Sequence, residues 1–192
     1  MPRISAPTVA QHRAAQRAAL IQAGQDVILE AGLGAVTPRA VCERAGLARS
    51  SFYDYFATKD DLLVAIAIAA IEAWDADLAG AMAGAEPGLP SLRVLVNATM
   101  AMTADGRHEI AGALRDAHIS PSRFEDVMAL HDALIRPLVR VLGELDVAEP
   151  ATQAILVQGV LGAGIQLVTH GVPHEQVADD VFALITSGLL RA

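Results

Sequence analysis

Arginine, serine and tyrosine side chains gather in one short segment of this chain, RSSFYDYF at 49–56. Phe52 and Phe56 are four residues apart, so on a helix they share one face, which we expect to be buried. The other side would present Arg49, Ser50, Ser51, Tyr53 and Tyr55. These side chains suit a DNA major groove, because Arg can donate two hydrogen bonds to guanine while Ser and Tyr hydroxyls can donate to phosphates.

Aromatic residues are concentrated in the same segment. The chain has four Phe, two Tyr and one Trp, and four of these seven lie between positions 52 and 56. A helix that only faces water does not require exposed tyrosines beside an arginine and two serines. The alternative is a plain three-helix packing unit with half-buried tyrosines, since the helix-turn-helix pattern is loosely defined.

The residues around this segment predict a helix, a tight turn and a second helix. Thr37 can cap the first helix, and Pro38 fits the first helical position because its missing N–H is not needed there. Gly46 stands where that helix should end, at a position that usually needs left-handed backbone. We expect the second helix at about 49–56 and a third that begins with Thr58 as its cap.

The segment resembles the DNA-binding domain of the TetR/AcrR family of bacterial repressors. In that family a threonine opens the second helix, an Ala-Gly-hydrophobic-Ser turn follows, and a helix with a Tyr-x-His/Tyr-Phe sequence reads DNA. The similarity covers about 11–63, and the matching residues are Thr37, Ala45-Gly46-Leu47-Ala48, Ser50-Ser51-Phe52-Tyr53-Asp54-Tyr55-Phe56 and Thr58-Lys59. Two positions depart from the family pattern: Ala48 replaces the usual Ser or Thr cap, and Asp54 adds a negative charge.

The resemblance implies roles for individual residues. It implies base-edge contacts for Arg49, Ser50 and Ser51, and phosphate contacts for Thr37, Tyr53, Tyr55 and Lys59. Arg13 and Arg17 share a face near the start of the first helix, an end that lies near the DNA backbone in this family. They are further candidates for phosphate contacts, with ordinary surface charge as the alternative.

Composition favours an all-α protein. The chain has 192 residues, is 53% hydrophobic and is rich in Ala, and it lacks alternating β-branched runs. We expect an N-terminal three-helix helix-turn-helix DNA-binding domain at 1–58 and a larger helical domain for ligand binding and dimerisation at 59–192. About nine helices are expected, at 8–31, 38–45, 49–56, 59–83, 91–104, up to 118, 121–145, 151–170 and 174–190.

Charge is distributed unevenly. The whole chain carries a formal net charge of −8, but residues 1–60 carry +2 and residues 61–192 carry −10. The basic excess therefore coincides with the candidate DNA-contacting segment. Because it is small, nonspecific DNA affinity should be modest and strongly salt-dependent.

A ligand pocket is expected in the helical body. Pro137 interrupts the expected helix 121–145 and should kink it, which can open space in a bundle. Methionines, aromatic residues and a histidine would face that interior, and the candidates are Trp74, Met100, Met102, Phe124, Met128 and His131. Ordinary core filling is the alternative for the same residues.

The last two helices are candidates for dimerisation. The first has a face with almost no side chain, at Gly159, Gly162 and Ala163, and the second has an apolar stripe that includes Val177, Val181, Leu184 and Ile185. In the TetR/AcrR family such a pair forms a four-helix bundle with a second copy. The alternative is that the two helices only close the core of one chain.

Catalytic, metal and cofactor sites are not indicated. The chain has no HExxH, GxSxG or P-loop sequence, and Gly171 and Pro173 break the helix that would align His170 and His174 as metal ligands. A single cysteine, no signal peptide and no sufficiently long apolar run predict a cytoplasmic protein with no membrane contact.

The sequence therefore predicts a homodimeric, ligand-responsive transcriptional regulator, most simply a repressor. It would bind a palindromic double-stranded DNA operator and be released by a small, largely hydrophobic effector. The alternatives are a helical enzyme that acts on a hydrophobic small molecule, and an adaptor whose segment 37–59 binds protein.

Overall fold

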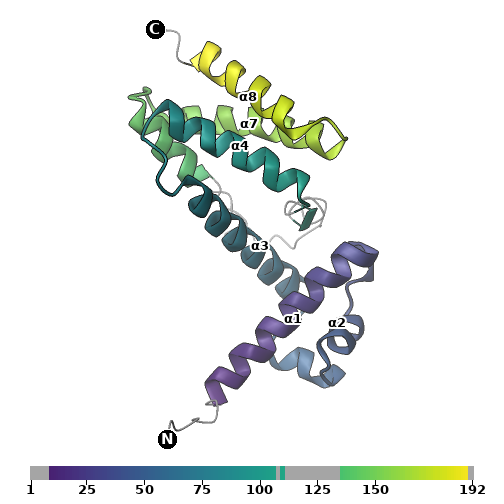
Figure 1. The fold of residues 1–192 in the computed structure, drawn as a ribbon. Coiled ribbons are helices and arrows are strands. Elements are labelled where there is room, and N and C mark those ends of the chain that lie inside the picture. Colours follow the sequence, from purple (N-terminus) through teal and green to yellow (C-terminus); the bar gives the residue numbers. More distant parts are fainter. Residues whose placement is uncertain (1–8, 107–108, 111–134, 190–192) are drawn as a thin grey trace, which may run out of the picture. The chain divides into compact units, whose positions relative to one another are not determined.

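The computed structural model describes residues 9–106, 109–110 and 135–189, and this part of the chain is helical without a strand (Figure 1). The predicted all-α class is confirmed. The elements, with η for 3-10 helices, are α1 (Val9–Ala31), η1 (Leu33–Ala35), α2 (Pro38–Ala45), η2 (Arg49–Asp54), α3 (Lys59–Met82), α4 (Leu89–Ala104), α7 (Pro150–Thr169) and α8 (His174–Leu189). Residues 135–144 form a further helix.

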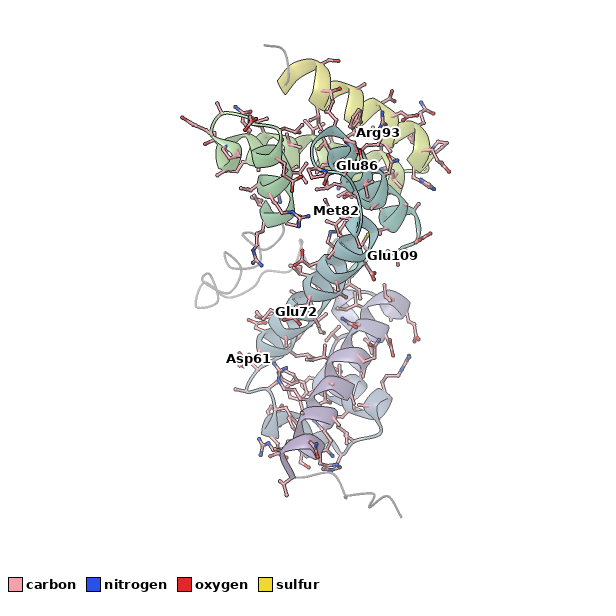
Figure 2. All side chains as sticks on the ribbon, turned by 60° about the vertical axis from the view of Figure 1, so that its left-hand side comes forward. Asp61, Glu72, Met82, Glu86, Arg93 and Glu109 are labelled. Atoms are coloured by element: carbon pink, nitrogen blue, oxygen red, sulfur yellow. The ribbon has the colours of Figure 1, made fainter. Side chains whose placement is uncertain are left out.

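The described residues fall into two compact units, 9–70 with residue 110, and 71–106 with residues 109 and 135–189. Helix α3 contributes to both, with Asp61 near its start and Met82 at its end (Figure 2). Its first half belongs to the N-terminal unit because Leu62, Leu63 and Ile66 are buried there. The functional division at 58/59 drawn from the sequence remains a proposal.

The N-terminal unit is built on an apolar stripe of α1. Leu20, Ala23, Val27 and Ile28 are buried, whereas Ala31 at the end of the helix is exposed. A Cβ at Gly24 would lie 2.5 Å from Cδ1 of Ile66, so the missing side chain lets α1 and α3 approach closely.

The segment after α2 differs from its prediction. It forms a 3-10 helix over Arg49–Asp54 instead of an α-helix over 49–56, and the N–H of Ser51 donates to the carbonyl of Ala48 at 2.9 Å. Ala48 supplies no side-chain cap, and at six residues η2 is longer than most 3-10 helices. The predicted burial of both phenylalanines is nevertheless confirmed, since Phe52 and Phe56 are 0% and 3% exposed.

The C-terminal unit packs α4 against α7 and α8 (Figure 1). Its core includes Leu92, Val96 and Met100 of α4, Val157 and Leu161 of α7, Val177, Val181 and Ile185 of α8, and Leu138, Val141 and Leu142 of helix 135–144. Arg93 of α4 donates to Asp179 of α8 at 2.7 Å, and its guanidinium lies 3.6 Å from the centroid of the Phe182 ring.

Helix α7 is apolar on two faces. By length and composition it is the one described helix that would be able to span a membrane. One face is packed in the core through Ala154, Val157 and Leu161. The other face exposes Ile155, Leu156 and Leu167, each more than half exposed, so this helix is a core helix on one side only.

Candidate nucleic-acid interface

Helix α2 begins and ends at the residues that the sequence indicated. The hydroxyl of Thr37 accepts a hydrogen bond from the backbone N–H of Ala40 at 3.1 Å. Gly46 adopts left-handed backbone, with φ 68° and ψ 28°, and the N–H of Leu47 donates to the carbonyl of Cys42 at 2.9 Å. This closed helix end fixes the direction in which the chain enters η2.

Element η2 carries the candidate base-contacting residues on its outer side. Arg49, Ser50 and Tyr53 are exposed, and Ser51 is partly exposed. The Tyr53 side chain is 58% exposed although its ring packs edge-on against buried Phe52, with the ring centroids 5.4 Å apart. The buried Phe52 ring therefore supports the Tyr53 ring, while most of the Tyr53 side chain stays accessible to a binding partner.

Contacts from α1 hold the end of η2 in place. The hydroxyl of Tyr55 donates to Oε1 of Gln16 at 2.5 Å, and Arg13 donates to the backbone carbonyl of Asp54 at 3.0 Å. The guanidinium of Arg13 also lies 5.5 Å from the Tyr55 ring centroid, and that of Arg17 lies 5.3 Å from the Phe56 ring centroid. The structure therefore brings both arginines beside η2, and it gives Tyr55 and Arg13 supporting contacts that the sequence did not predict.

The start of α3 completes the surface. Thr58 and Asp61 cap each other: the Asp61 N–H donates to the Thr58 hydroxyl at 3.1 Å, and the Thr58 N–H donates to Asp61 Oδ2 at 2.9 Å. Lys59 is partly buried, with Nζ 3.4 Å from the carbonyl oxygen of Leu33. Its ammonium group keeps further donors, so this contact leaves a phosphate contact open to it.

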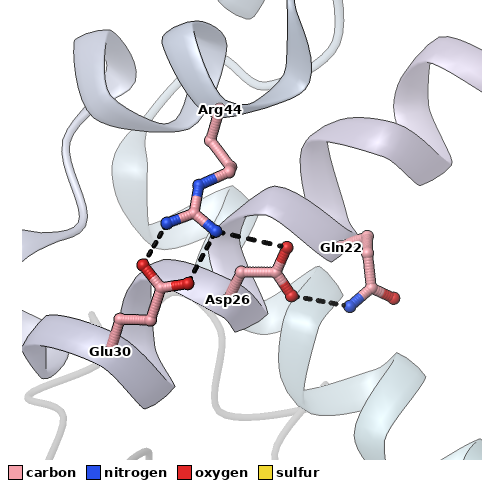
Figure 3. Close-up of polar contacts among 4 residues, drawn as sticks. All are labelled: Gln22, Asp26, Glu30 and Arg44. Atoms are coloured by element: carbon pink, nitrogen blue, oxygen red, sulfur yellow. Dashed lines mark hydrogen bonds and ion pairs between the residues drawn. The ribbon is translucent and has the colours of Figure 1, made fainter.

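A charged cluster joins α2 to α1 and was not predicted from the sequence (Figure 3). Arg44 forms hydrogen bonds with both carboxylate oxygens of Glu30 and lies 3.8 Å from Asp26, which accepts a hydrogen bond from Gln22. The hydrogen bond from Arg44 lowers the pKa of Glu30, and the same contact raises the pKa of Arg44. The three α1 residues recur every four positions, which is the only signal that the sequence offers.

The candidate pocket residues are only partly described. Met100 and Met102 are buried, and Met100 lies against Gly164 in the core of the C-terminal unit, which is the core-filling alternative for that residue. Trp74 is partly exposed. Phe124, Met128 and His131 lie outside the described residues.

The candidate dimerisation residues divide into two sets. Gly159, Ala163 and Leu184 are exposed and Gly162 is partly exposed. Val177, Val181 and Ile185 are buried in the chain's own core, which is the core-closing alternative for these three. The reason is that α4 and α7 pack against the apolar stripe of α8. The exposed apolar residues Ile155, Leu156 and Leu167 of α7 were not singled out from the sequence.

Metal ligands and the single cysteine were further places where the sequence could have carried a site. Among them, no group of three His, Cys, Asp or Glu side chains could hold a metal ion. Cys42 is 1% exposed, and burial raises the pKa of its thiol, which disfavours the reactive thiolate.

Known families and structures provide independent comparisons. Residues 20–66 match the model of the bacterial regulatory proteins of the tetR family. No curated protein matches the chain. The matched residues run from α1 into the first half of α3 and include η2 and the Arg44 cluster.

Solved structures share the fold over most of the chain. The fatty acid degradation regulator FadR of Bacillus halodurans has a TM-score of 0.74 and 19% identity, with 91% of this chain and 96% of that chain covered. FadR of Bacillus subtilis, solved with stearoyl-CoA, has a TM-score of 0.73 and 16% identity, with 89% and 98% covered. The TetR family regulator PfmR of Thermus thermophilus has a TM-score of 0.65 and 21% identity, with 88% and 98% covered. The N-terminal residues 20–66 thus match the tetR family, and the chain as a whole shares the fold of such regulators.

Proposed function

We propose that the chain is a homodimeric transcriptional repressor that binds a near-palindromic operator and is released from it by a small effector with an apolar part. The observation that carries this proposal is the outward face of η2. Arg49, Ser50 and Tyr53 are exposed there while Phe52 and Phe56 beneath them are buried.

Each exposed side chain fits a contact with duplex DNA. The guanidinium of Arg49 can reach a guanine edge, because within the described part of the chain this residue is held only through its carbonyl oxygen, which accepts from the Cys42 thiol at 4.0 Å. The hydroxyl of Tyr53 can donate to a phosphate, which fixes the position of the protein but carries no sequence information. Ser50 and Ser51 are small enough to let the backbone approach the bases.

The distribution of charge also supports DNA binding by the N-terminal unit. The net charge of +2 over residues 1–60 attracts the phosphate backbone, and the −10 over residues 61–192 repels it. DNA would therefore meet the N-terminal unit. Arg13 and Arg17 of α1 and Lys59 at the start of α3 are proposed as phosphate contacts together with Thr37. Tyr55 is proposed as one too, and its hydroxyl would then exchange its Gln16 partner for a phosphate.

The exposed apolar residues of α7 and α8 support a dimer. Ile155, Leu156, Leu167 and Leu184 are each more than half exposed, and Gly159 and Gly162 beside them would allow close approach of a second copy. A two-fold dimer presents two recognition elements about one helical turn of DNA apart, roughly 34 Å, so the operator should be an inverted repeat.

The effector is proposed to act by shifting populations. It would lower DNA affinity only to the extent that it binds the released state better than the DNA-bound state. The structure of Bacillus subtilis FadR with stearoyl-CoA supports a small molecule with an apolar part as the class of effector. DNA binding also implies action in the cytoplasm.

In vitro selection tests the function. The purified chain is incubated with sheared DNA from its own genome, and the bound fragments are sequenced. We expect an enriched inverted repeat whose half-sites are centred about 10 base pairs, or a multiple of that, apart. Recovery of DNA without any common sequence would contradict the proposal and favour the helical enzyme or the adaptor.

A further inference from the structure

The C-terminal unit has a groove on its surface. It has a volume of about 220 Å³ and lies between the last turns of α3 and helix 135–144. Its apolar lining comes from Leu78, Ala79 and Met82 of α3 and from Pro137 of the other helix. Arg136 and Arg140 line the same groove, together with one acidic residue, Asp75.

The apolar wall of the groove is held in place by the core. Leu78 and Met82 are 5% and 7% exposed and belong to the core cluster of this unit. Ala79, one residue from Leu78, is exposed. The wall is therefore preformed, and a ligand would not have to order it on binding.

The two arginines are placed to receive a negative charge. They are four residues apart on one helix, so they project from the same face, and both are exposed. Within the described part of the chain, Arg140 makes one long contact, 3.9 Å from Nε to Oε1 of Glu144, and Arg136 makes no ion pair. Arg93, the remaining arginine in the described part of this unit, is by contrast paired with Asp179.

This arrangement stands out against the charge of its surroundings. Residues 61–192 carry a formal charge of −10, yet the groove is lined by two cations and one anion. A local positive charge beside an apolar wall is complementary to a molecule with an anionic head and a short apolar chain. Its volume is below the ~300 Å³ at which pockets for drug-sized ligands begin, so the enclosed chain must be short.

We infer that this groove binds a small amphipathic carboxylate. The carboxylate accepts hydrogen bonds from Arg136 and Arg140, and the alkyl chain lies along Leu78, Ala79 and Met82. The inference names a chemical class for the effector, and in that respect it rests on the proposed function. Because Leu78, Ala79 and Met82 belong to the helix whose first residue is Lys59, the ligand would touch the element that leads directly from η2.

Isothermal titration calorimetry without DNA tests the site directly. The probes are decanoate, below its micelle concentration, and 1-decanol, which has the same chain without the charge. Decanoate is expected to bind about tenfold more tightly than decanol, because charge-assisted hydrogen bonds are the stronger ones. Equal affinity for the two probes would overturn the carboxylate assignment.

Three variants locate the binding. Arg136→Gln with Arg140→Gln should weaken decanoate binding about tenfold and leave decanol unchanged. Ala79→Phe fills the groove from an exposed position and should weaken both probes. Arg39→Gln removes one positive charge from an exposed pair in the other unit and should change neither.

The outcomes separate this inference from the proposed function. Decanoate binding that survives both Arg136→Gln/Arg140→Gln and Ala79→Phe, with circular dichroism spectra unchanged, would place the ligand elsewhere and overturn the site. Because the titration contains no DNA, that result would leave operator binding untouched. Failure to bind DNA, measured separately, would in turn leave the ligand site standing.

Discussion

Arg44 is the residue that ties α2, and with it the entry to η2, to the long helix α1. Its guanidinium hydrogen-bonds both carboxylate oxygens of Glu30 and lies 3.8 Å from Asp26 (Figure 3). Arg39 on the same helix instead pairs with Glu43, one turn away on α2 itself, at 2.8 Å. The first pair links two helices, whereas the second stays within one.

Replacing Arg44 with Ala should therefore lower the melting temperature more than replacing Arg39 with Ala. Both arginines are exposed, so the loss is modest and is best measured as the difference between the two variants by thermal denaturation. Equal melting temperatures for the two variants would show that Arg44 contributes nothing as a link between helices.

The same contact predicts a pH dependence. Arg44 lowers the pKa of Glu30 below its ordinary value of 4.5, so the folded state holds this carboxylate ionised where the unfolded chain begins to take up a proton. The contribution is fully present above pH 4.5 and is lost as the pH falls through the lowered, folded-state pKa. The stability difference between the wild type and Glu30→Gln should be constant at neutral pH and shrink in that acidic window.

Cys42 should be chemically inert in the folded protein. It is 1% exposed and burial raises the pKa of its thiol, so little thiolate is present and reagents cannot reach it. A thiol reagent such as 5,5′-dithiobis(2-nitrobenzoate) should react slowly with the native chain at pH 8 and fully in denaturant. Fast reaction of the native chain would contradict the burial of this residue.

The sequence indicates the roles of single residues where these depend on nearby positions, but not where they depend on distant ones. Thr37, Gly46 and Phe52 act as the sequence indicated, because a cap, a left-handed turn and a buried aromatic each depend on neighbours a few positions away. Arg44 and Glu30 are fourteen positions apart, and only the packing of α2 on α1 brings them together.

Among the helices, glycines decide how closely neighbours pack. A Cβ at Gly164 of α7 would lie 2.8 Å from Cε of Met100 and 2.9 Å from Cγ2 of Val181. The flexible end of the Met100 side chain can move away, but Val181 has a stiff, β-branched side chain and lies in the core. Gly80 of α3 is also helical, and a Cβ there meets nothing within 4 Å.

Gly164→Ala and Gly80→Ala should therefore change stability in opposite directions. Replacing a helical glycine gains up to about 1 kcal/mol in helix propensity. At Gly80 that gain should appear in full, whereas at Gly164 overpacking, which costs about 1–3 kcal/mol, should outweigh it. Urea denaturation measures both, and stabilisation by Gly164→Ala would contradict the close packing of α7 on α4 and α8.

The sequence predicts the positions of the helices well, but it does not predict which face of each helix packs against the core. The expected bounds of α1, α3, α7 and α8 lie within a residue or so of the observed ones, because caps, glycines and prolines mark the helix ends. Helix α7 is apolar on both sides, so its sequence cannot say whether Val157 or Leu156 faces the core. In α8, contacts with α4 and α7 turned Val181 and Ile185 inward and left Leu184 outward.

Dimerisation determines whether the η2 elements of two copies can bind one operator together. Leu184→Glu places a charge on the exposed apolar face of α8, where the wild-type side chain is 61% exposed. We expect a monomer by light scattering and weaker operator binding, because a buried unpaired charge opposes association. Gln176→Glu adds the same charge at another exposed position of α8 and should remain dimeric; a Leu184→Glu dimer would mean that a different surface joins the copies.

The outward face of η2 is proposed to contact DNA, and a fluorescence anisotropy titration of labelled operator DNA tests that contact. Arg49→Ala should cost roughly tenfold to a hundredfold in affinity for the operator, through the loss of a base contact worth about 1–3 kcal/mol. Tyr53→Ala should weaken operator and unrelated DNA alike. Arg140→Gln, on the other unit, is the matched control. Undiminished operator binding by a folded Arg49→Ala/Tyr53→Ala/Lys59→Ala variant would contradict the account.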